Sequence, residues 1–297
     1  MFCSLKNNKK QRRILPGFGI TLGFTLLYLG ILVILPLVML VLTASSLSWD
    51  EFLQIITAPR AVAAYRLSFG ASFIAAIINA IFGSLLAWVL VRYRFFGRKI
   101  IDALIDLPFA LPTAVAGITL VTLYRVPDDP TTITWYKGGL GYLIKEYLGI
   151  NVAPGELGVI VALVFIGIPF VVRTLQPVLA DLEPELEEAA ACMGAGRFRI
   201  FCNVIFPTLL PSLFTGFSLA FARALGEYGS VVFIAGNMPL KTEILPLLIM
   251  IKLEEPNGYA AAAALALVML LASFLIMLMV NFISLRAGRR ALKKHRE

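Results

Sequence analysis

Six long stretches of this chain contain no Asp, Glu, Lys or Arg, and this feature most constrains how the chain can fold. The stretches cover residues 14–49, 67–91, 107–124, 157–172, 200–222 and 259–285. A helix that crosses a bilayer needs roughly 20 predominantly apolar residues, and runs of this length can supply them. A chain that is 59% hydrophobic, with a mean hydropathy of +0.87, is also unlike a water-soluble domain.

We therefore predict an all-α polytopic membrane protein with six transmembrane helices. The expected spans are 18–42, 67–91, 103–124, 157–179, 209–236 and 259–285. The first span shows no small-residue cleavage pattern near its start, so we interpret it as a retained helix. The predicted organisation is a basic tail at 1–17, a transmembrane domain at 18–285 with a large loop at 181–207, and a second basic tail at 286–297. The remaining segments are too short for a separate soluble catalytic domain.

Basic residues concentrate in the two tails and in the short loop at 92–99. Other loops are more balanced, as where Arg60 and Arg66 face Asp50 and Glu51 in the connection after the first span. By the positive-inside rule, this distribution places both termini in the cytoplasm, which requires an even number of spans. The net charge of +8 is therefore interpreted as a topology signal near anionic lipid, and no nucleic-acid partner is expected.

The chain offers few groups for catalysis. Its only histidine, His295, lies in the C-terminal tail, which excludes a His-based triad or a His-rich metal site. The glycine-rich segment 138–141 lacks the Lys-Ser/Thr of a phosphate-binding loop. Cys3, Cys192 and Cys202 have no CxxC spacing and are expected to be free thiols. We expect no enzyme activity, no catalytic residue, no cofactor and no metal.

The loop at 181–207 is predicted to form two short helices. Pro184 suits the first position of a helix, and the acidic residues that follow it complement the positive helix start. The segment 194–196, with a glycine at each end, permits left-handed backbone angles that break the helix. The second helix is expected over 197–206 and is expected to end at Pro207. Its apolar stripe consists of Phe198, Phe201, Val204 and Ile205.

The same loop resembles the EAA loop of permease subunits in ABC importers. The matching residues, at the spacing EAA-x3-G-x9-I-x-L-P, are Glu188, Ala189, Ala190, Gly194 and Pro207. Val204 and Phe206 stand where the motif has Ile and Leu. The resemblance implies the type I, MetI-like permease fold, in which this loop is the coupling helix that docks on a cytoplasmic ATPase. ATP would then be hydrolysed on that separate chain.

Four further segments, 106–117, 167–177, 221–230 and 236–244, resemble sulfate and thiosulfate permeases of the CysT type. The resemblance implies an ATP-driven importer of sulfate and thiosulfate. It also implies a second permease subunit, an ATPase subunit dimer and an external sulfate-binding protein as partners, besides the lipid bilayer. Because molybdate permeases share the first three segments in similar form, residues 237–244 provide most of the preference for sulfate.

Two alternatives remain open at this point. One is a molybdate or tungstate importer of the same family, since these tetrahedral dianions differ from sulfate mainly in size. The other is an ion-coupled secondary anion transporter, although the first and last three spans show no convincing internal repeat. The expected location is a bacterial inner membrane or, alternatively, a plastid inner envelope membrane.

Arg223 and Glu227 form the one strongly ionic spot inside a predicted span. A lone arginine at the centre of a membrane helix costs about 2.5–3.5 kcal/mol, so Arg223 should face the bundle interior with a partner. Glu227 is one turn away and within reach. The pair is either a structural ion pair or a contact for a passing dianion, and Gly226 and Gly229 allow close approach of a helix or the substrate.

Three more charged residues lie at the predicted cytoplasmic ends of spans. Asp102 and Asp106 follow the basic loop at 92–99 and are expected to pair with its cations rather than bind metal. Arg173 is expected to be an interfacial anchor or a partner for the glutamates at 183–188.

Overall fold

The computed structural model of the chain describes residues 18–126 and 139–294. The predicted tail at 1–17, Cys3, Gly138 and His295 lie outside the described residues. Within these ranges the regular secondary structure is helical, apart from one isolated β-bridge between Arg125 and Ala153. The α-helices are α1 (Phe18–Leu29), α2 (Leu35–Ala44), α3 (Trp49–Thr57), α4 (Pro59–Arg92), α5 (Arg98–Ile105), α6 (Leu107–Ala110), α7 (Thr113–Tyr124), α8 (Gly139–Leu148), α9 (Glu156–Ala180), α10 (Pro184–Cys192), α11 (Arg197–Ile200), α12 (Phe206–Leu225), α13 (Val231–Ile234), α14 (Leu245–Glu254) and α15 (Tyr259–Lys294). Two π-helical segments, η1 (Gly30–Ile34) and η3 (Phe201–Ile205), interrupt them.

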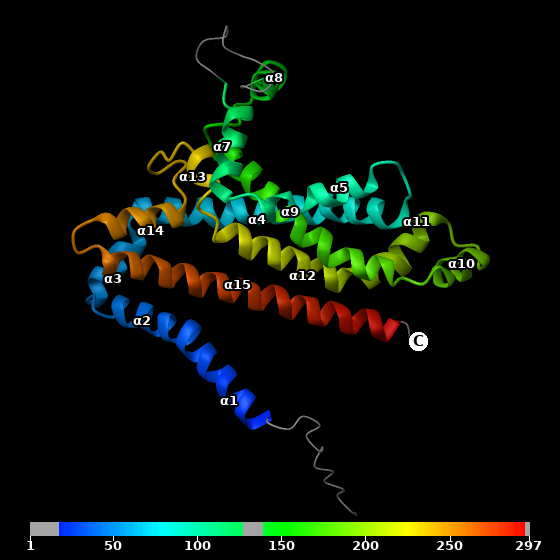
Figure 1. The fold of residues 1–297 in the computed structure, drawn as a ribbon, viewed down its shortest axis with the longest axis horizontal. Helices are drawn as coiled ribbons and strands as arrows, with labels where there is room; N and C mark the ends of the chain where they lie inside the picture. The colour runs from blue at the N-terminus through cyan, green and yellow to red at the C-terminus, as the bar shows by residue number, and fades with distance from the viewer. Residues whose placement is uncertain (1–17, 127–138, 295–297) are drawn as a thin grey trace, which may run out of the picture.

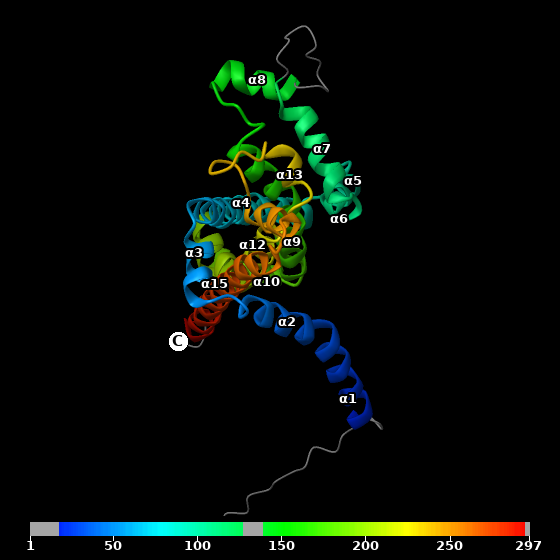
Figure 2. The same ribbon diagram turned by 90° about the vertical axis from the view of Figure 1, so that its left-hand side faces the viewer.

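Five helical segments among the described residues are long and apolar enough to cross a membrane. They are Phe18–Ala44, Pro59–Arg92, Glu156–Ala180, Arg197–Leu225 and Tyr259–Ser284. The last four lie lengthwise against one another, with α4 beside α9 and α12, and α12 beside α15 (Figure 1). In the first segment α2 contacts α15, whereas α1 stands away from the bundle, and the most apolar stretch of the segment buries no residue (Figure 2).

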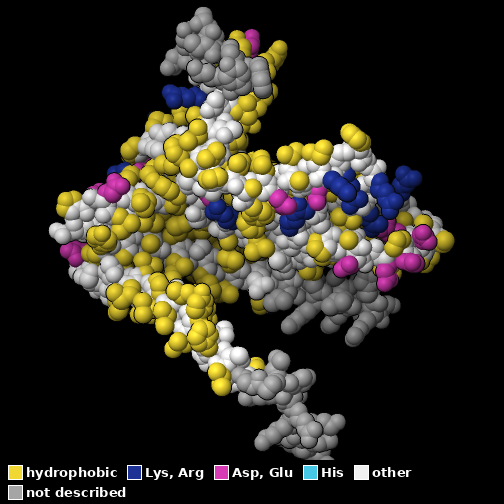
Figure 3. Space-filling view, in the orientation of Figure 1, with side chains coloured by type: hydrophobic (Ala, Val, Ile, Leu, Met, Phe, Trp, Pro, Cys, Tyr) yellow, Lys and Arg dark blue, Asp and Glu magenta, His cyan; other side chains and the backbone are white. Residues whose placement is uncertain are grey.

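The bundle has two ends with different neighbours. The α10 end is formed by α10, α11 and the start of α5, and the α14 end is formed by α3, α13, α14 and the loop at 236–244 (Figure 1). Figure 3 shows charged side chains gathered at the α10 end, whereas hydrophobic side chains dominate the middle of the molecule. This distribution matches long helices that bury their backbone polar groups internally and present apolar side chains to lipid.

Small residues bring α4 and α9 close together in the bundle. A Cβ built on Gly83 would lie 2.9 Å from Cβ of Val171, and one on Gly167 would lie 2.1 Å from Nδ2 of Asn79. Close backbone approach of this kind is how membrane helices gain packing contacts. The core at the α10 end includes Leu90, Val172, Leu175, Leu179, Ile200 and Leu209. The core at the α14 end includes Ala71, Val159, Leu163, Val231, Ile234 and Ile244.

The predicted third span, 103–124, is not a continuous helix. The chain instead forms α5, α6 and α7, with breaks at Asp106 and at Leu111 and Pro112. Prolines lack an N–H, and Leu111 before Pro112 is extended, with ψ of 136°, as the steric demand of the ring requires. α7 has 12 residues and crosses the direction of the long helices, projecting from the bundle together with α8 (Figures 1 and 2). The described residues therefore contain five candidate spans, not six.

The predicted fifth span, 209–236, begins and ends earlier than expected. Pro207 does not end a helix, because the chain runs without a break from α11 through η3 into α12. In η3 the N–H of Phe206 donates to the carbonyl of Phe201, five residues back, and this wider turn precedes Pro207, which takes the second position of α12. The helix ends at Leu225, which places Glu227 in the turn before α13 and not within the span.

Candidate functional site

The sequence of the EAA-like loop explains the fold of α10. The helix begins at Pro184, with Glu185 and Glu187 in its positively polarised first turn. At its end Gly194 has φ of +83°, a left-handed conformation that favours glycine. The N–H of Ala195 donates to the carbonyl of Ala190, and that of Gly194 to the carbonyl of Ala191. These two bonds form a Schellman motif, which ends the helix as predicted.

The α10 end exposes both charged and large apolar side chains. Glu188 and Ala189 are exposed, while Ala190 is buried against the core. Met193 and Phe198 are 82% and 81% exposed. Large apolar side chains beside charged ones are a common feature of a protein interface. The predicted stripe on the second helix is wrong at Phe198, because this side chain points away from the bundle.

Arg92 joins α10 to the end of α4. Its guanidinium pairs with the carboxylate of Glu187 and lies over the ring of Trp88, 5.3 Å from the ring centroid. Trp88 in turn packs edge-on against Phe201 of η3, with a centroid distance of 6.0 Å. Through these contacts α10 is linked to both α4 and η3.

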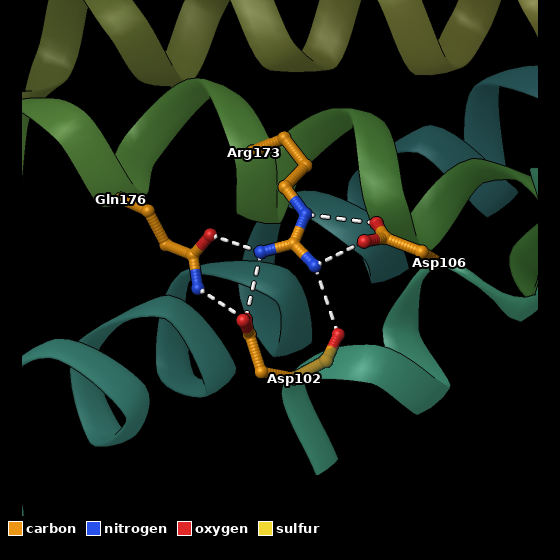
Figure 4. Close-up of polar contacts among 4 residues, drawn as sticks. All are labelled: Asp102, Asp106, Arg173 and Gln176. Carbon is orange, nitrogen blue, oxygen red and sulfur yellow. Dashed lines mark hydrogen bonds and ion pairs between the residues drawn. The ribbon is translucent and has the colours of Figure 1, made fainter. Parts of the chain in front are cut away.

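Arg173 on α9 holds the broken α5–α6 segment in place (Figure 4). Its Nε and Nη2 donate to Asp106 at 2.8 and 2.5 Å, and its Nη1 donates to Oδ1 of Asp102 at 2.7 Å. Gln176 donates to Asp102 at 2.9 Å, and this bond, with the adjacent Arg173, lowers the pKa of the Asp102 carboxyl. The prediction that the two aspartates pair with the cations of loop 92–99 was wrong, because both form ion pairs with Arg173. Arg173 therefore does not pair with the glutamates at 183–188.

Arg223 and Glu227 form the predicted ion pair, but at the end of α12. Nη1 of Arg223 lies 2.6 Å from Oε2 of Glu227, and the Glu227 side chain is only 2% exposed. The N–H and the hydroxyl of Ser230 donate to the other carboxylate oxygen at 3.0 and 3.2 Å. A buried carboxylate requires such partners. The arrangement fixes the turn between α12 and α13.

Glycines bring this turn against the start of α7. A Cβ on Gly229 would lie 2.2 Å from Oγ1 of Thr113, and one on Gly117 would lie 2.5 Å from the carbonyl oxygen of Ser230. The segments 106–117 and 221–230, which the sequence singled out separately, therefore pack on each other. Gly226 has no such close neighbour, since its Cβ would lie 3.9 Å from the nearest atom.

The structure contains a further ion pair, between Arg60 and Glu243, that the sequence did not reveal. Nε and Nη2 of Arg60 each donate to a different oxygen of Glu243 at 2.7 Å. The Glu243 side chain is 2% exposed, and it belongs to the segment 236–244. Arg60 and Arg66 lie on α4 itself, because that helix begins at Pro59, and not in a connecting loop as predicted. The two partners are 183 residues apart, so no local pattern relates them.

Cys192 and Cys202 are free thiols, as predicted. Within residues 18–126 and 139–294, no group of three or more His, Cys, Asp or Glu side chains could hold a metal ion.

These features first define a class: a polytopic helical membrane protein whose short surface helix is tied to the ends of its spans. A family model described as the binding-protein-dependent transport system inner membrane component matches residues 79–289. The chain belongs to this family. It is therefore an inner-membrane transport component and not an enzyme.

Individual relatives are similar over nearly the whole chain. The sulfate transport system permease protein CysT of Escherichia coli (strain K12) is 47% identical over 280 residues, covering 94% of this chain and 97% of that protein. A probable sulfate transport system permease protein cysT of Nephroselmis olivacea is 48% identical over 261 residues, covering 88% of both chains. That of Marchantia polymorpha is 42% identical over 284 residues, covering 96% of this chain and 94% of that protein.

Solved structures share the fold at low sequence identity. A chain of a bacterial ABC transporter involved in the import of the acidic polysaccharide alginate superimposes with a TM-score of 0.72 at 15% identity, covering 91% of this chain and 95% of that chain. The MetNI methionine ABC transporter, in an inward-facing conformation, gives a TM-score of 0.52 at 15% identity, covering 82% of this chain and 99% of that chain. The predicted ABC importer permease fold is confirmed at this level.

Proposed function

We propose that this chain is the membrane-spanning permease subunit of an ATP-driven importer that moves sulfate, and thiosulfate, into the cytoplasm. The observation on which this rests is the 47% identity to a sulfate permease across 94% of the chain. Molybdate or tungstate is the competing substrate. The segment 237–244, on which the resemblance to sulfate permeases depends most, and the similarity to sulfate permeases over nearly the whole chain support sulfate.

The proposed topology has six passes with both termini in the cytoplasm and the α10 end inside. α4 runs from the α14 end, where Arg60 meets Glu243, to the α10 end, where Arg92 meets Glu187. α9 runs in the same direction and leads into α10. Residues 93–155 must therefore bring the chain back across, so we assign residues 103–124, which the breaks between α5, α6 and α7 divide, as a discontinuous third span, with Asp102 just before it. Figure 1 places the end of α15 on the α10 side, which supports an even number of passes.

The domain limits follow from this topology. We propose basic cytoplasmic tails at 1–17 and 286–297, and a permease domain at 18–285 that contains the coupling loop at 181–207.

We propose that α10 is the helix that docks on the ATPase. The residues assigned to coupling are Glu188, Ala189, Ala190, Gly194 and Pro207. Exposure of Met193 and Phe198 beside Glu188 supports a protein partner here. Closure of the ATPases would move α10, and the contacts of Arg92 and the continuous η3–α12 helix would pass this motion to the bundle.

The proposed assembly contains a second permease subunit, an ATPase subunit dimer and an external sulfate-binding protein. A solved relative of the same fold, the alginate ABC transporter, was determined in complex with a periplasmic protein that holds its pentasaccharide. By the same logic, the binding protein would dock at the α14 end, opposite α10.

We assign Arg223, Glu227, Gly226 and Gly229 to the substrate pathway. The 2% exposure of Glu227 and its bonds from Ser230 support a brace for the turn. Arg223 is 37% exposed, so its guanidinium also has an open side that a dianion could approach.

Uptake of labelled sulfate tests the proposal in cells that lack their own sulfate permease subunit and carry this chain instead. We expect uptake that depends on ATP and that excess thiosulfate blocks but excess molybdate does not. Inhibition by molybdate with no sulfate uptake would identify the competing importer. Uptake that continues after the ATPase subunit is deleted would identify an ion-coupled carrier and contradict the proposal.

A further inference from the structure

A cavity of about 870 Å³ opens at the α14 end, between α4, the start of α9 and the loop before α14. Its lining includes Val62 and Arg66 of α4, Glu156 of α9, and Leu240 and Lys241 of the loop. Its position, at the end opposite α10, is where an imported solute would first meet the permease.

Two cations at this cavity have no carboxylate partner. The side chains of Arg66 and Lys241 are exposed, and neither forms an ion pair or hydrogen bond with any residue in the described parts of the chain. Three other cations around this end, Arg60, Arg223 and Lys252, each pair with a glutamate. Charged residues in membrane-spanning helices are costly and face either the protein interior or a water-filled cavity. Arg66, inside the α4 span, fits this rule by facing the cavity.

Buried contacts on either side of Lys241 hold the loop that carries it. Thr242 and Glu243, which follow Lys241, are each only 3% exposed. Oγ1 of Thr242 accepts a bond from the N–H of Met238 at 2.9 Å, and Glu243 is held by both donors of Arg60. Leu240 has φ of +67°, which is rare for a branched side chain and persists only where the surroundings impose it. Lys241 is therefore positioned by buried contacts and is not a loose surface lysine.

We propose that Arg66 and Lys241 form a receiving site for a tetrahedral divalent oxyanion, such as sulfate, before it enters the bundle. The direction of transfer rests on the proposed function. A concave site lined by two unpaired cations suits a small solute better than the flat surface of a protein partner. The carboxylate of Glu156 also lines the cavity, so Arg66, Lys241 and Glu156 together carry a net charge of +1. The site therefore binds a dianion weakly. Weak binding suits a transport site, which must release its ion as readily as it takes it up.

Cysteine accessibility tests this site without relying on transport. Val62 is 51% exposed at the cavity, and Val62→Cys is introduced into a chain whose three native cysteines are replaced by serine. The assembled transporter is treated with anionic and cationic methanethiosulfonate reagents. We expect the anionic reagent to react about tenfold faster, because fixed charges raise the local concentration of counter-ions. Millimolar sulfate should slow this reaction, while sodium chloride at equal ionic strength should not.

The double variant Arg66→Gln/Lys241→Gln should lose both the preference for the anionic reagent and the protection by sulfate. Lys145→Gln, which removes an exposed positive charge on α8 outside the cavity lining, is the matched control and should keep both. Absence of sulfate protection in the unsubstituted background would overturn the inference. So would protection by anionic lipid vesicles alone, since this would assign the two cations to a lipid surface.

Uptake measured in the same preparation separates this inference from the proposed function. Sulfate uptake without sulfate protection at Val62→Cys would reject the receiving site and leave the importer intact. Protection without any ATP-driven uptake would support the site and reject the importer.

Discussion

The two ends of the bundle use ion pairs in different ways. At the α14 end the carboxylates of Glu227 and Glu243 are each 2% exposed and cannot lose their arginines without leaving a buried charge. At the α10 end the side chain of Glu187 is 28% exposed and that of Asp102 is 43% exposed. Water can replace a partner there at low cost. The α14 end is therefore a fixed frame, whereas the α10 end is a surface whose contacts can exchange.

Glycines differ in the same way between the two ends. Gly194, at the α10 end, has open space around it and is required for its positive φ. Gly117 and Gly229, at the α14 end, are required because other atoms lie where a Cβ would go. The first kind of glycine shapes the end of α10, and the second kind allows segments to pack closely together.

The largest expected effect is on transport, from Gly194→Val. A β-branched residue at φ of +83° costs about 1–2 kcal/mol and distorts the Schellman turn. We expect ATP-dependent sulfate uptake to be abolished, while the amount of chain in the membrane stays the same. Gly196→Val is the matched control, because Gly196 has φ of −69° and nothing within 4 Å of its Cβ position. Equal uptake by the two variants would show that the backbone shape at the end of α10 does not matter for coupling.

Gly117→Ala should destabilise the α14 end. The new Cβ would meet the backbone of Ser230 at 2.5 Å, and backbone cannot move aside as a flexible side chain can. Overpacking of this kind costs about 3 kcal/mol. We expect a lower midpoint of thermal unfolding for the purified protein in nanodiscs. Gly23→Ala on α1, where nothing lies within 4 Å, should leave the midpoint unchanged.

The same substitution at the two ends of α4 compares them directly. Arg60→Met leaves Glu243 buried without its partner and should cost about 3 kcal/mol, the low end for a broken buried pair because Arg60 itself is 37% exposed. Arg92→Met leaves a partly exposed Glu187 and should cost less than about 1 kcal/mol. Both are measured as unfolding free energies in the same nanodiscs. Equal losses would remove the distinction between a fixed and an exchangeable end.

The smallest effect is the pH dependence of the Arg173 cluster. The pKa of Asp102 is lowered in the folded state, mainly by the hydrogen bond from Gln176. Its contribution to the free energy of unfolding is therefore fully present when the pH is above the unfolded pKa, near 3.8. It is lost as the pH falls through the lower folded pKa. Because the side chain is 43% exposed, this contribution is below about 1 kcal/mol.

Asp102→Asn should therefore lower the unfolding midpoint slightly at pH 7 and flatten its decrease between pH 5 and pH 3. Asp181→Asn is the control, because Asp181 is exposed and has no ion pair among the described residues. An unchanged acid profile for Asp102→Asn would mean that Arg173 does not depend on this carboxylate.

The parts of the site that the sequence predicted are local. Pro184 and Gly194 mark the ends of α10 through backbone rules that act within a few residues. Arg223 and Glu227 are four residues apart, so their pairing followed from spacing. The pairs Arg60–Glu243 and Arg173–Asp106 join residues 183 and 67 positions apart, and only the packed bundle brings them together.

The fold was predicted less well at two places where prolines lie in an apolar run. Hydropathy alone treated 103–124 as one span, although Pro108 and Pro112 divide it. At Pro207 the opposite error arose, because a π-helical turn lets the helix continue past a residue that usually ends one. In both places the outcome depends on which carbonyls neighbouring segments can satisfy, and the sequence does not reveal this.

Reconstituted proteoliposomes test the central claim most directly. They would contain this chain, its partner permease and the ATPase, with labelled sulfate and the sulfate-binding protein on the side of the α14 end. The account predicts that sulfate accumulates only when ATP is present on the side of α10 and the binding protein is loaded. Accumulation driven by an ion gradient without ATP would contradict it.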